Sequence, residues 1–393
     1  MAIPNELSAA IDDAVAADAR DLIALAANLH ANPELRFEEV KAAAWISELV
    51  ASRNITVERG LAGMPTSLRA RAGKAGGGGG RVAILAEYDA LPEIGHACGH
   101  NLIAAGAVGA FLAAAKLAER AGGEVVLIGT PAEEGGGGKI KLIDAGAFDG
   151  LDAAMMFHPF DRDVLAHTAL ASLWLMFDFT GVPSHAAAAP HVGHSALTAC
   201  MDTFRLIDGQ RVHFLDGVRV HGFITNGGQA VNIIPERAAC EFSVRARDSA
   251  ELARVRAIVE RCARAAAMAS GVEVAATVRQ GYKDMRNNLT MARIFGEHLA
   301  AAGRTARETD PRAGAGSTDM GDVSHVVPSI HPYLAIVGEG EALCHEHRFV
   351  AASASDEGAR TALLAARAMA KTAIELLRSS ALRDAVRAEW QSR

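Results

Sequence analysis

The fold is decided by residues 81–120, which read RVAILAEYDALPEIGHACGHNLIAAGAVGAFLAAAKLAER. This stretch opens with a short apolar run, Val82–Ala86, and closes with a segment of helical apolar spacing, Leu102–Arg120. A short buried strand followed by a helix is the repeating unit of a parallel α/β sheet. Between the two lies GHACGHN, Gly95–Asn101, whose thiol and imidazole groups can bind a metal ion.

Other apolar runs in the chain also end in polar, metal-capable residues. Glu124–Gly129 precedes Glu133 and Glu134, Ala153–Phe157 precedes His158, and Leu334–Val337 precedes a loop with His345 and His347. In parallel α/β sheets, ligands bind beyond the carboxyl ends of the strands. We therefore expect an α/β domain with a mostly parallel sheet and a metal site at that edge.

A different pattern runs between residues 169 and 281. Its elements are expected at Ser172–Thr180, His194–Gly209, Val218–Ile224, Arg237–Arg247, Ser249–Ser270 and Val272–Arg279. Their order, β-α-β-β-α-β, is that of a ferredoxin-like α+β unit. Ser172–Thr180 has the character of an exposed edge strand. The sequence thus predicts a domain of residues 169–281 inserted into a catalytic domain of residues 1–168 and 282–393.

Length and composition limit the function. A chain of 393 residues favours two domains, and a net charge of −7 disfavours a nucleic-acid binder. The N-terminal segment has no secretory pattern, and the most apolar stretch, Leu102–Ala115, is too short to span a bilayer. Five irregularly spaced cysteines form no disulfide framework. The glycine run Ala75–Gly80 is expected to be a surface turn rather than a phosphate loop. We expect a cytoplasmic protein without membrane or nucleic-acid partners.

Each candidate site residue has more than one interpretation when taken alone. Cys98 and His100 can bind a transition metal, or the thiol can be a nucleophile activated by a neighbouring histidine. Glu133 and Glu134 can supply a ligand and a base, or form a solvated acidic loop. The later histidines can be metal ligands, or they can have structural roles. In that case His158 is a capped core histidine, and His345 and His347 are solvated loop residues.

Taken together, these residues supply what metal-assisted hydrolysis requires. Bound metal ions lower the pKa of water and polarise a carbonyl group. A neighbouring carboxylate can accept the proton of the water and pass it to the leaving amine. Thiolate and imidazole ligands suit zinc, and carboxylates widen the choice to manganese or cobalt.

Several longer motifs follow one another in the order of a known family. They are LHANPELRFEE (Leu29–Glu39), EYDALPEIGHACGHN (Glu87–Asn101), PAEEGGGGK (Pro131–Lys139), GVPSHAAAAP (Gly181–Pro190), VNIIPERA (Val231–Ala238) and STDMGDVSHVVP (Ser317–Pro328). The chain resembles the aminoacylase and carboxypeptidase clan of co-catalytic metallopeptidases, in the amidohydrolase branch with hippurate and auxin-conjugate hydrolases. CGHN and STDMGDVS are similar to the aminobenzoyl-glutamate hydrolase subgroup.

The resemblance implies a role for each residue. The implied ligands of one or two divalent ions are Cys98 as the bridge, His100, Glu134, His158 and His345. The ions would be zinc or manganese, with cobalt or nickel as alternatives. His345 is preferred to His347 because the family histidine stands four residues before an aromatic, here Phe349.

The remaining implied roles concern the reaction and the substrate. Glu133 would be the general base, and His185 would stabilise the oxyanion, often in the site of a partner subunit. Asn232 and Asp319 would line the substrate pocket, and Asp89 would support the ligands from behind. The inserted domain would act as a lid and form a homodimer.

The chain also departs from the family pattern. Asn101 replaces an aspartate found in many relatives, and Glu87 stands where peptidase branches place a metal-binding histidine. The substrate-carboxylate arginine has only candidates, Arg245, Arg286 and Arg312. We expect a metal-dependent amidohydrolase of N-acyl or N-aroyl amino acids or short dipeptides. The alternatives are hydrolytic deamination of an aminoaromatic compound and a non-catalytic metal or small-molecule binding module.

Overall fold

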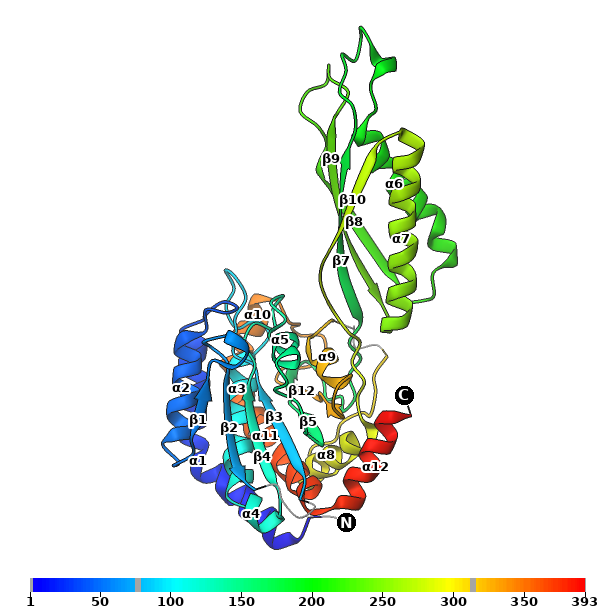
Figure 1. The fold of residues 1–393 in the computed structure, drawn as a ribbon. Coiled ribbons are helices and arrows are strands. Elements are labelled where there is room, and N and C mark those ends of the chain that lie inside the picture. The colour runs from blue at the N-terminus through cyan, green and yellow to red at the C-terminus, as the bar shows by residue number, and fades with distance from the viewer. Residues whose placement is uncertain (1–2, 75–78, 312–315, 393) are drawn as a thin grey trace. The chain divides into compact units, whose positions relative to one another are not determined.

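The computed structural model describes residues 3–74, 79–311 and 316–392, and the chain divides into two compact units (Figure 1). Unit 1 comprises Met1–Thr168, Met285–Ala315 and Asp319–Arg393. Unit 2 comprises Ala169–Asp284 and Gly316–Thr318. Two sequence features lie outside the described residues, namely residues 75–78 of the glycine-rich run and Arg312.

A six-stranded sheet forms the centre of unit 1. Its order is β1 (Val57–Arg59), β2 (Leu68–Gly73), β4 (Glu124–Gly129), β3 (Arg81–Ala86), β5 (Ala153–Met155) and β11 (Ser329–Ile330). The strands from β4 to β11 run parallel, and β1 and β2 are antiparallel to their neighbours. The predicted α/β class with a mostly parallel sheet is confirmed.

Alternate residues of the central strands pack into cores on opposite faces of this sheet. Val82 and Ile84 join a core with helices α1 (Asn5–Ala31), α3 (His100–Ala115) and α11 (Asp356–Arg378). Ala83 and Leu85 join a second core on the other face. Helices α5 (Gly138–Asp144) and α9 (Met320–Ser324) contribute to this second core. The remaining helices of unit 1 are α2 (Val40–Ala51), α4 (Ala118–Ala121), α8 (Leu289–Ala301), α10 (His347–Ser353) and α12 (Ser380–Gln391).

The prediction that Leu334–Val337 joins the main parallel sheet is wrong. The strand there, β12 (Tyr333–Ala335), pairs with β6 (His158–Phe160) in a separate two-stranded parallel sheet. Pro159 and Pro332 mark the change of sheet, because proline has no backbone N–H to donate to a ladder. His158 therefore opens a second short strand instead of ending the first.

Unit 2 has the predicted β-α-β-β-α-β order. Its elements are β7 (Ala171–Thr180), α6 (Ala196–Gln210), β8 (Arg219–Asn226), β9 (Arg237–Ala246), α7 (Ser249–Ser270) and β10 (Glu273–Tyr282). The antiparallel sheet has the order β10-β7-β9-β8, and α6 and α7 cover one of its faces (Figure 1). This is a ferredoxin-like arrangement.

The expectation that Ser172–Thr180 is an edge strand is wrong. β7 pairs with β10 on one side and with β9 on the other, so it lies inside the sheet. Its alternating apolar residues are buried against α6 and α7, which explains why the segment is so hydrophobic. The two edge strands are β10 and β8. In β8, Val220 is the one buried residue.

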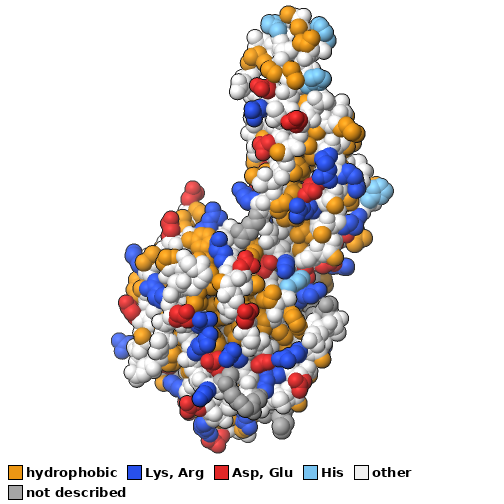
Figure 2. Space-filling model, viewed as in Figure 1, with side chains coloured by type: hydrophobic (Ala, Val, Ile, Leu, Met, Phe, Trp, Pro, Cys, Tyr) orange, Lys and Arg blue, Asp and Glu red, His pale blue; other side chains and the backbone are white. Residues whose placement is uncertain are grey.

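The hydropathy of the helices and the distribution of surface charge bear on membrane and nucleic-acid partners. Among the described residues, no helix is both long and apolar enough to cross a membrane. On the face in Figure 2, acidic and basic side chains are interspersed.

Candidate metal centre

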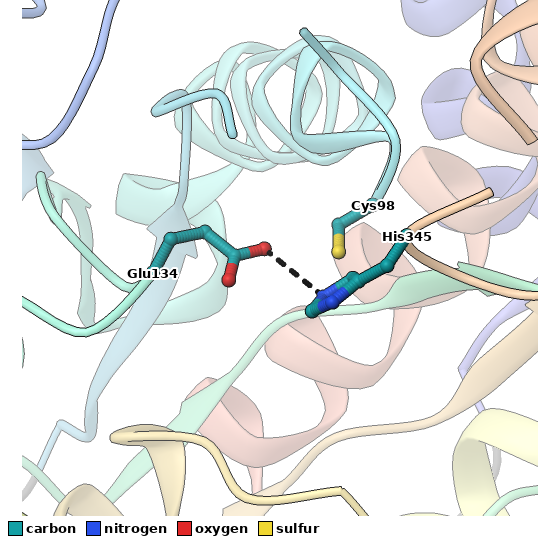
Figure 3. A group of neighbouring side chains, drawn as sticks. All are labelled: Cys98, Glu134 and His345. Carbon is teal, nitrogen blue, oxygen red and sulfur yellow. Dashed lines mark ion pairs between the residues drawn. The ribbon is translucent and has the colours of Figure 1, made fainter. Parts of the chain in front are cut away.

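Cys98, Glu134 and His345 meet in unit 1 from three separate segments (Figure 3). Cys98 precedes α3, Glu134 follows β4, and His345 lies in the loop before α10. One potential ligand atom from each lies within 4.8 Å of the other two, and Glu134 Oε1 is 3.7 Å from His345 Nε2. A thiol, a carboxylate and an imidazole at this spacing can hold one divalent ion.

The backbone explains why His345 joins this group. Its φ angle is +72°, an uncommon conformation for a residue other than glycine, and its N–H donates to the carbonyl of Ala97 at 3.0 Å. The loop is therefore tied to the residue next to Cys98. His347, the alternative, begins α10 and is not among the metal-capable groups of the described residues.

A second group shares Glu134 with the first and adds His100 and Glu133. His100 is the first residue of α3 and is fully buried. Its Nδ1 lies 2.9 Å from the backbone oxygen of Asp89 and 3.2 Å from Asp89 Oδ1. Because both partners are acceptors, the ring hydrogen sits on Nδ1, and Nε2 is left to bind a metal.

His158 lies beside these groups without belonging to them. Its ring centroid is 6.1 Å from that of His100, and the ring stacks on Tyr333. Its Nδ1 donates to the carbonyl of Pro159 at 2.6 Å, so that Nε2 has a free lone pair. Burial lowers the pKa of His158 to about 3. The ring is therefore neutral, as a ligand must be.

A third group, Glu87, Glu133 and Asp319, adjoins the second through Glu133. Lys139 is completely buried against it, with Nζ 2.5 Å from Glu87 Oε1 and 2.6 Å from Asp319 Oδ1. The lysine amide also donates to Asp319 Oδ2 at 3.0 Å. Sequence reasoning missed Lys139, and its only signal was its place at the end of PAEEGGGGK.

Gly138 explains how Lys139 reaches this position. A Cβ atom on Gly138 would lie 1.8 Å from the carbonyl oxygen of Pro131. Only glycine allows α5 to begin against the segment that carries Glu133 and Glu134.

Burial and negative charge dominate the electrostatics. Burial and the charges of Glu87, Glu134 and Asp319 raise the pKa of Glu133 well above its usual value. Burial opposes the positive charge of Lys139, yet the charges of Asp319 and Glu87 outweigh it and raise the lysine pKa. The pKa of the Cys98 thiol is raised by its hydrogen bond with Cys344, by burial and by Glu134. Such a field attracts cations.

The residues fit a bound divalent metal. Among the described residues, three buried atoms lack a hydrogen-bond partner and belong to these groups: His100 Nε2, Glu134 Oε1 and Glu87 Oε2. Unpartnered acceptors are costly in a buried site, and a cation removes that cost. The mixture of thiol, imidazole and carboxylate donors is suited to zinc or manganese.

His185 and Asn232 lie together in unit 2. The amide of Ala186 donates to the Asn232 carbonyl, and His185 forms an isolated bridge with Ile233. The amides of Ala187 and Ala188 donate to His185 Nδ1 at 3.2 and 3.1 Å. The ring hydrogen is therefore on Nε2, and the exposed side chain presents a hydrogen-bond donor.

Asn101 has a structural explanation. Its side-chain amide donates to the carbonyls of Ala26 and Ser353, at 3.2 and 2.9 Å, and joins α3 to two other segments. An aspartate could not donate to these oxygens when ionised. The departure from the family pattern is therefore a change in the support of α3.

Two arginines proposed for a substrate carboxylate lie in separate units. Arg245 is on β9 of unit 2, and Arg286 is in unit 1, where its backbone amide donates to Ser324 Oγ.

Comparison with known proteins supports the motif-based resemblance. Residues 83–368 match Peptidase family M20/M25/M40. The Xaa-Arg dipeptidase of Mus musculus is 36% identical over 95% of this chain and 89% of its own length. A p-aminobenzoyl-glutamate hydrolase subunit from Escherichia coli is 28% identical over 98% of this chain and 95% of its own length.

A solved structure has the same fold. The dinuclear metal-binding peptidase of Bacillus subtilis has a TM-score of 0.70 and 22% identity, over 92% of this chain and 99% of its own. The family match covers most of the chain, and the mouse relative aligns with nearly all of it. The chain belongs to peptidase family M20/M25/M40 and is a metal-dependent hydrolase of amide bonds.

Proposed function

We propose that the protein hydrolyses the amide bond of an N-acyl or N-aroyl amino acid or of a short dipeptide. The observation that carries this proposal is the sharing of Glu133 and Glu134 among three adjoining metal-capable groups. One carboxylate can hold metal while its neighbour faces the reacting atoms. Such a pair serves hydrolysis better than simple metal storage.

The proposed metal ligands are Cys98 as a bridge, His100, Glu134, His158 and His345. Two ions, zinc or manganese, suit this donor set. When bound, such ions lower the pKa of water and polarise the amide carbonyl. Asp89 holds His100 in the tautomer that leaves Nε2 available.

Glu133 is the proposed general base. Its carboxylate accepts a proton from the attacking water and returns it to the leaving amine as the C–N bond breaks. The side chain is 12% exposed, so the surrounding protein excludes most of the bulk solvent. Because the pKa of Glu133 is raised, its carboxyl group can keep the proton after water attacks and until the amine leaves.

His185 is the proposed oxyanion donor. Its Nε2–H is available for a carbonyl oxygen that gains negative charge during attack. Family resemblance favours its action in the site of a partner subunit, within a homodimer formed by unit 2. The exposed edge of β8 supports this assembly, because an unpaired edge can add strands from a second copy.

The substrate class follows from the two named relatives. One is named for dipeptides that end in arginine and the other for an aroyl-glutamate, so they share an amide next to a free amino acid. We propose this shared chemistry for the chain. All five cysteines are free, which suits action in the reducing cytoplasm.

The test combines metal analysis with a hydrolysis screen of the purified protein. The panel contains aroyl-glutamates, Xaa-Arg dipeptides, N-acetyl amino acids and aminoaromatic compounds. Release of a free amino acid, lost after chelation and restored by zinc or manganese, supports the proposal. Ammonia release from aminoaromatics alone, or a metal-loaded protein inert to every amide, would overturn it.

A further inference from the structure

The two oxygens of Glu87 have different surroundings. Oε1 accepts a hydrogen bond from Lys139 Nζ at 2.5 Å. Oε2 has no hydrogen-bond partner among the described residues and lies 3.5 Å from His100 Nε2. The residue is completely buried, so bulk water does not reach this oxygen.

The atom that faces Glu87 Oε2 is His100 Nε2, which also has no hydrogen-bond partner among the described residues. His100 Nδ1 is directed instead at two oxygens of Asp89. A carboxylate oxygen and a ring nitrogen that both lack a hydrogen bond in a buried site are stabilised by a cation that lies between them.

The separation of these two atoms suits a shared metal ion. Ligand atoms that each lie about 2.1 Å from a tetrahedral zinc ion are about 3.4 Å from each other. The 3.5 Å between Glu87 Oε2 and His100 Nε2 is close to that value. The same distance is too long for a strong hydrogen bond.

Lys139 fixes the orientation of the Glu87 carboxylate. Its ammonium group lies between Glu87 and Asp319, and its own amide is held by Asp319. With one ammonium and two carboxylates, the trio keeps an excess negative charge. Lys139 therefore binds one oxygen of Glu87, and the other oxygen, which carries negative charge, faces His100.

We propose that Glu87 is an additional ligand of the ion bound by His100, and that Lys139 is the positioning residue for it. This inference rests on the proposed metal centre. The competing explanation is that Glu87 only balances the charge of Lys139. In that case, neutralising Glu87 would change stability without changing metal binding.

The test measures metal binding, independently of hydrolysis. Glu87→Gln keeps the shape of the side chain and removes its charge. Metal content is measured by elemental analysis, the dissociation constant by chelator competition, and the coordination by the visible spectrum of the cobalt-substituted protein. We expect at least tenfold weaker binding of one ion and an altered cobalt spectrum.

The matched control is Glu375→Gln. Glu375 is a buried glutamate of α11 in the same unit, and its carboxylate lies 3.0 Å from the ring of His298 on α8. It does not belong to the metal-capable groups of the described residues. Its substitution is expected to leave metal affinity and the cobalt spectrum at wild-type values. Thermal unfolding of both chelated variants separates loss of fold from loss of a ligand.

The outcomes separate this inference from the proposed function. Wild-type affinity and an unchanged spectrum in Glu87→Gln would overturn the inference alone. A wild-type protein that binds neither zinc nor manganese would overturn the metal centre itself. If Glu87→Gln does not fold, Glu87→Asp is measured instead. The shorter aspartate keeps the negative charge beside Lys139, but its carboxylate no longer extends as far toward His100. Unchanged metal affinity in Glu87→Asp would count against a ligand role for Glu87.

Discussion

Asp89 joins the two segments that carry His100 and Glu134. One carboxylate oxygen lies 3.2 Å from His100 Nδ1, and the other accepts the backbone N–H of Glu134 at 2.9 Å. The side chain is buried, and its hydrogen bond with His100 lowers its pKa against the effect of burial. Asp89 therefore remains a carboxylate and sets the position of both neighbours.

Asp89→Asn should weaken metal binding without abolishing it. An amide side chain provides only one acceptor oxygen, so it cannot serve His100 and Glu134 in the same way. Loss of such an orienting partner costs about 10- to 100-fold in metal affinity. Chelator competition measures the change. Wild-type affinity would show that the ring of His100 keeps its orientation without this carboxylate.

The two C-terminal histidines offer a matched pair of substitutions. His345→Ala should lower the metal content, because His345 Nε2 lies in the group with Cys98 and Glu134. His347→Ala should leave it unchanged, since the side chain is exposed at the start of α10. Elemental analysis after dialysis compares the two proteins. The reverse result would move the ligand role to His347.

Glu133→Gln should stop turnover while the metal remains bound. The amide cannot accept the proton of water, and general base catalysis contributes about 10²- to 10⁴-fold to rate. We expect kcat to fall by that factor with little change in metal content. Glu134→Gln is the contrasting variant, because it should lose metal. A Glu133→Gln enzyme with normal kcat would exclude the base role.

Most of the fold could be predicted from local patterns. The strands near Val82–Ala86 and Glu124–Gly129 are short apolar runs with clear ends, and Ser249–Ser270 has strong helical spacing. The errors concern pairing, which depends on distant residues. The sequence of Ser172–Thr180 does not indicate that this strand pairs with a neighbour on each side. The sequence near Leu334 does not indicate that its strand pairs with the strand that begins at His158.

The structure brings together several side chains that the motifs place near strand ends, and their roles stay predictions. Lys139 was missed because a lysine after glycines is usually exposed, and only the tertiary structure shows its carboxylate partners. Asp319 is expected to line the substrate pocket, and this role stays a prediction. In the structure its side chain is completely buried, and both of its oxygens accept hydrogen bonds from Lys139. Contacts across 180 residues of sequence leave no local pattern.

Lys139→Met should destabilise the chelated protein by about 3–5 kcal/mol. Removing one partner leaves the buried carboxylates of Glu87 and Asp319 without their counter-charge. The control is Lys116→Met, which removes a half-exposed lysine 3.4 Å from Asp18 and should cost no more than about 1 kcal/mol. Urea unfolding measures both. Equal effects would mean that the Lys139 cluster contributes no more to stability than a surface ion pair does.

His167 should make the chelated protein lose stability in mild acid. Burial, together with the charge of Arg162, lowers its pKa to about 4, whereas an unfolded chain has a histidine pKa near 6.5. Between these values the unfolded chain binds a proton that the folded protein does not. The free energy of unfolding therefore falls as the pH drops from 6.5 toward 4.

The size of this effect can be isolated by substitution. Between pH 7 and pH 5, His167 should account for a loss of about 2 kcal/mol, which His167→Gln removes. His347→Gln, which replaces an exposed imidazole, should keep the wild-type pH dependence. Urea unfolding at both pH values provides the comparison. If His167→Gln loses as much stability in acid as the wild type, the His167 ring takes up its proton equally in the folded and unfolded chains. Acid sensitivity would then have to come from other groups, of which buried His96, with a pKa lowered to about 3 by burial, is the next to test.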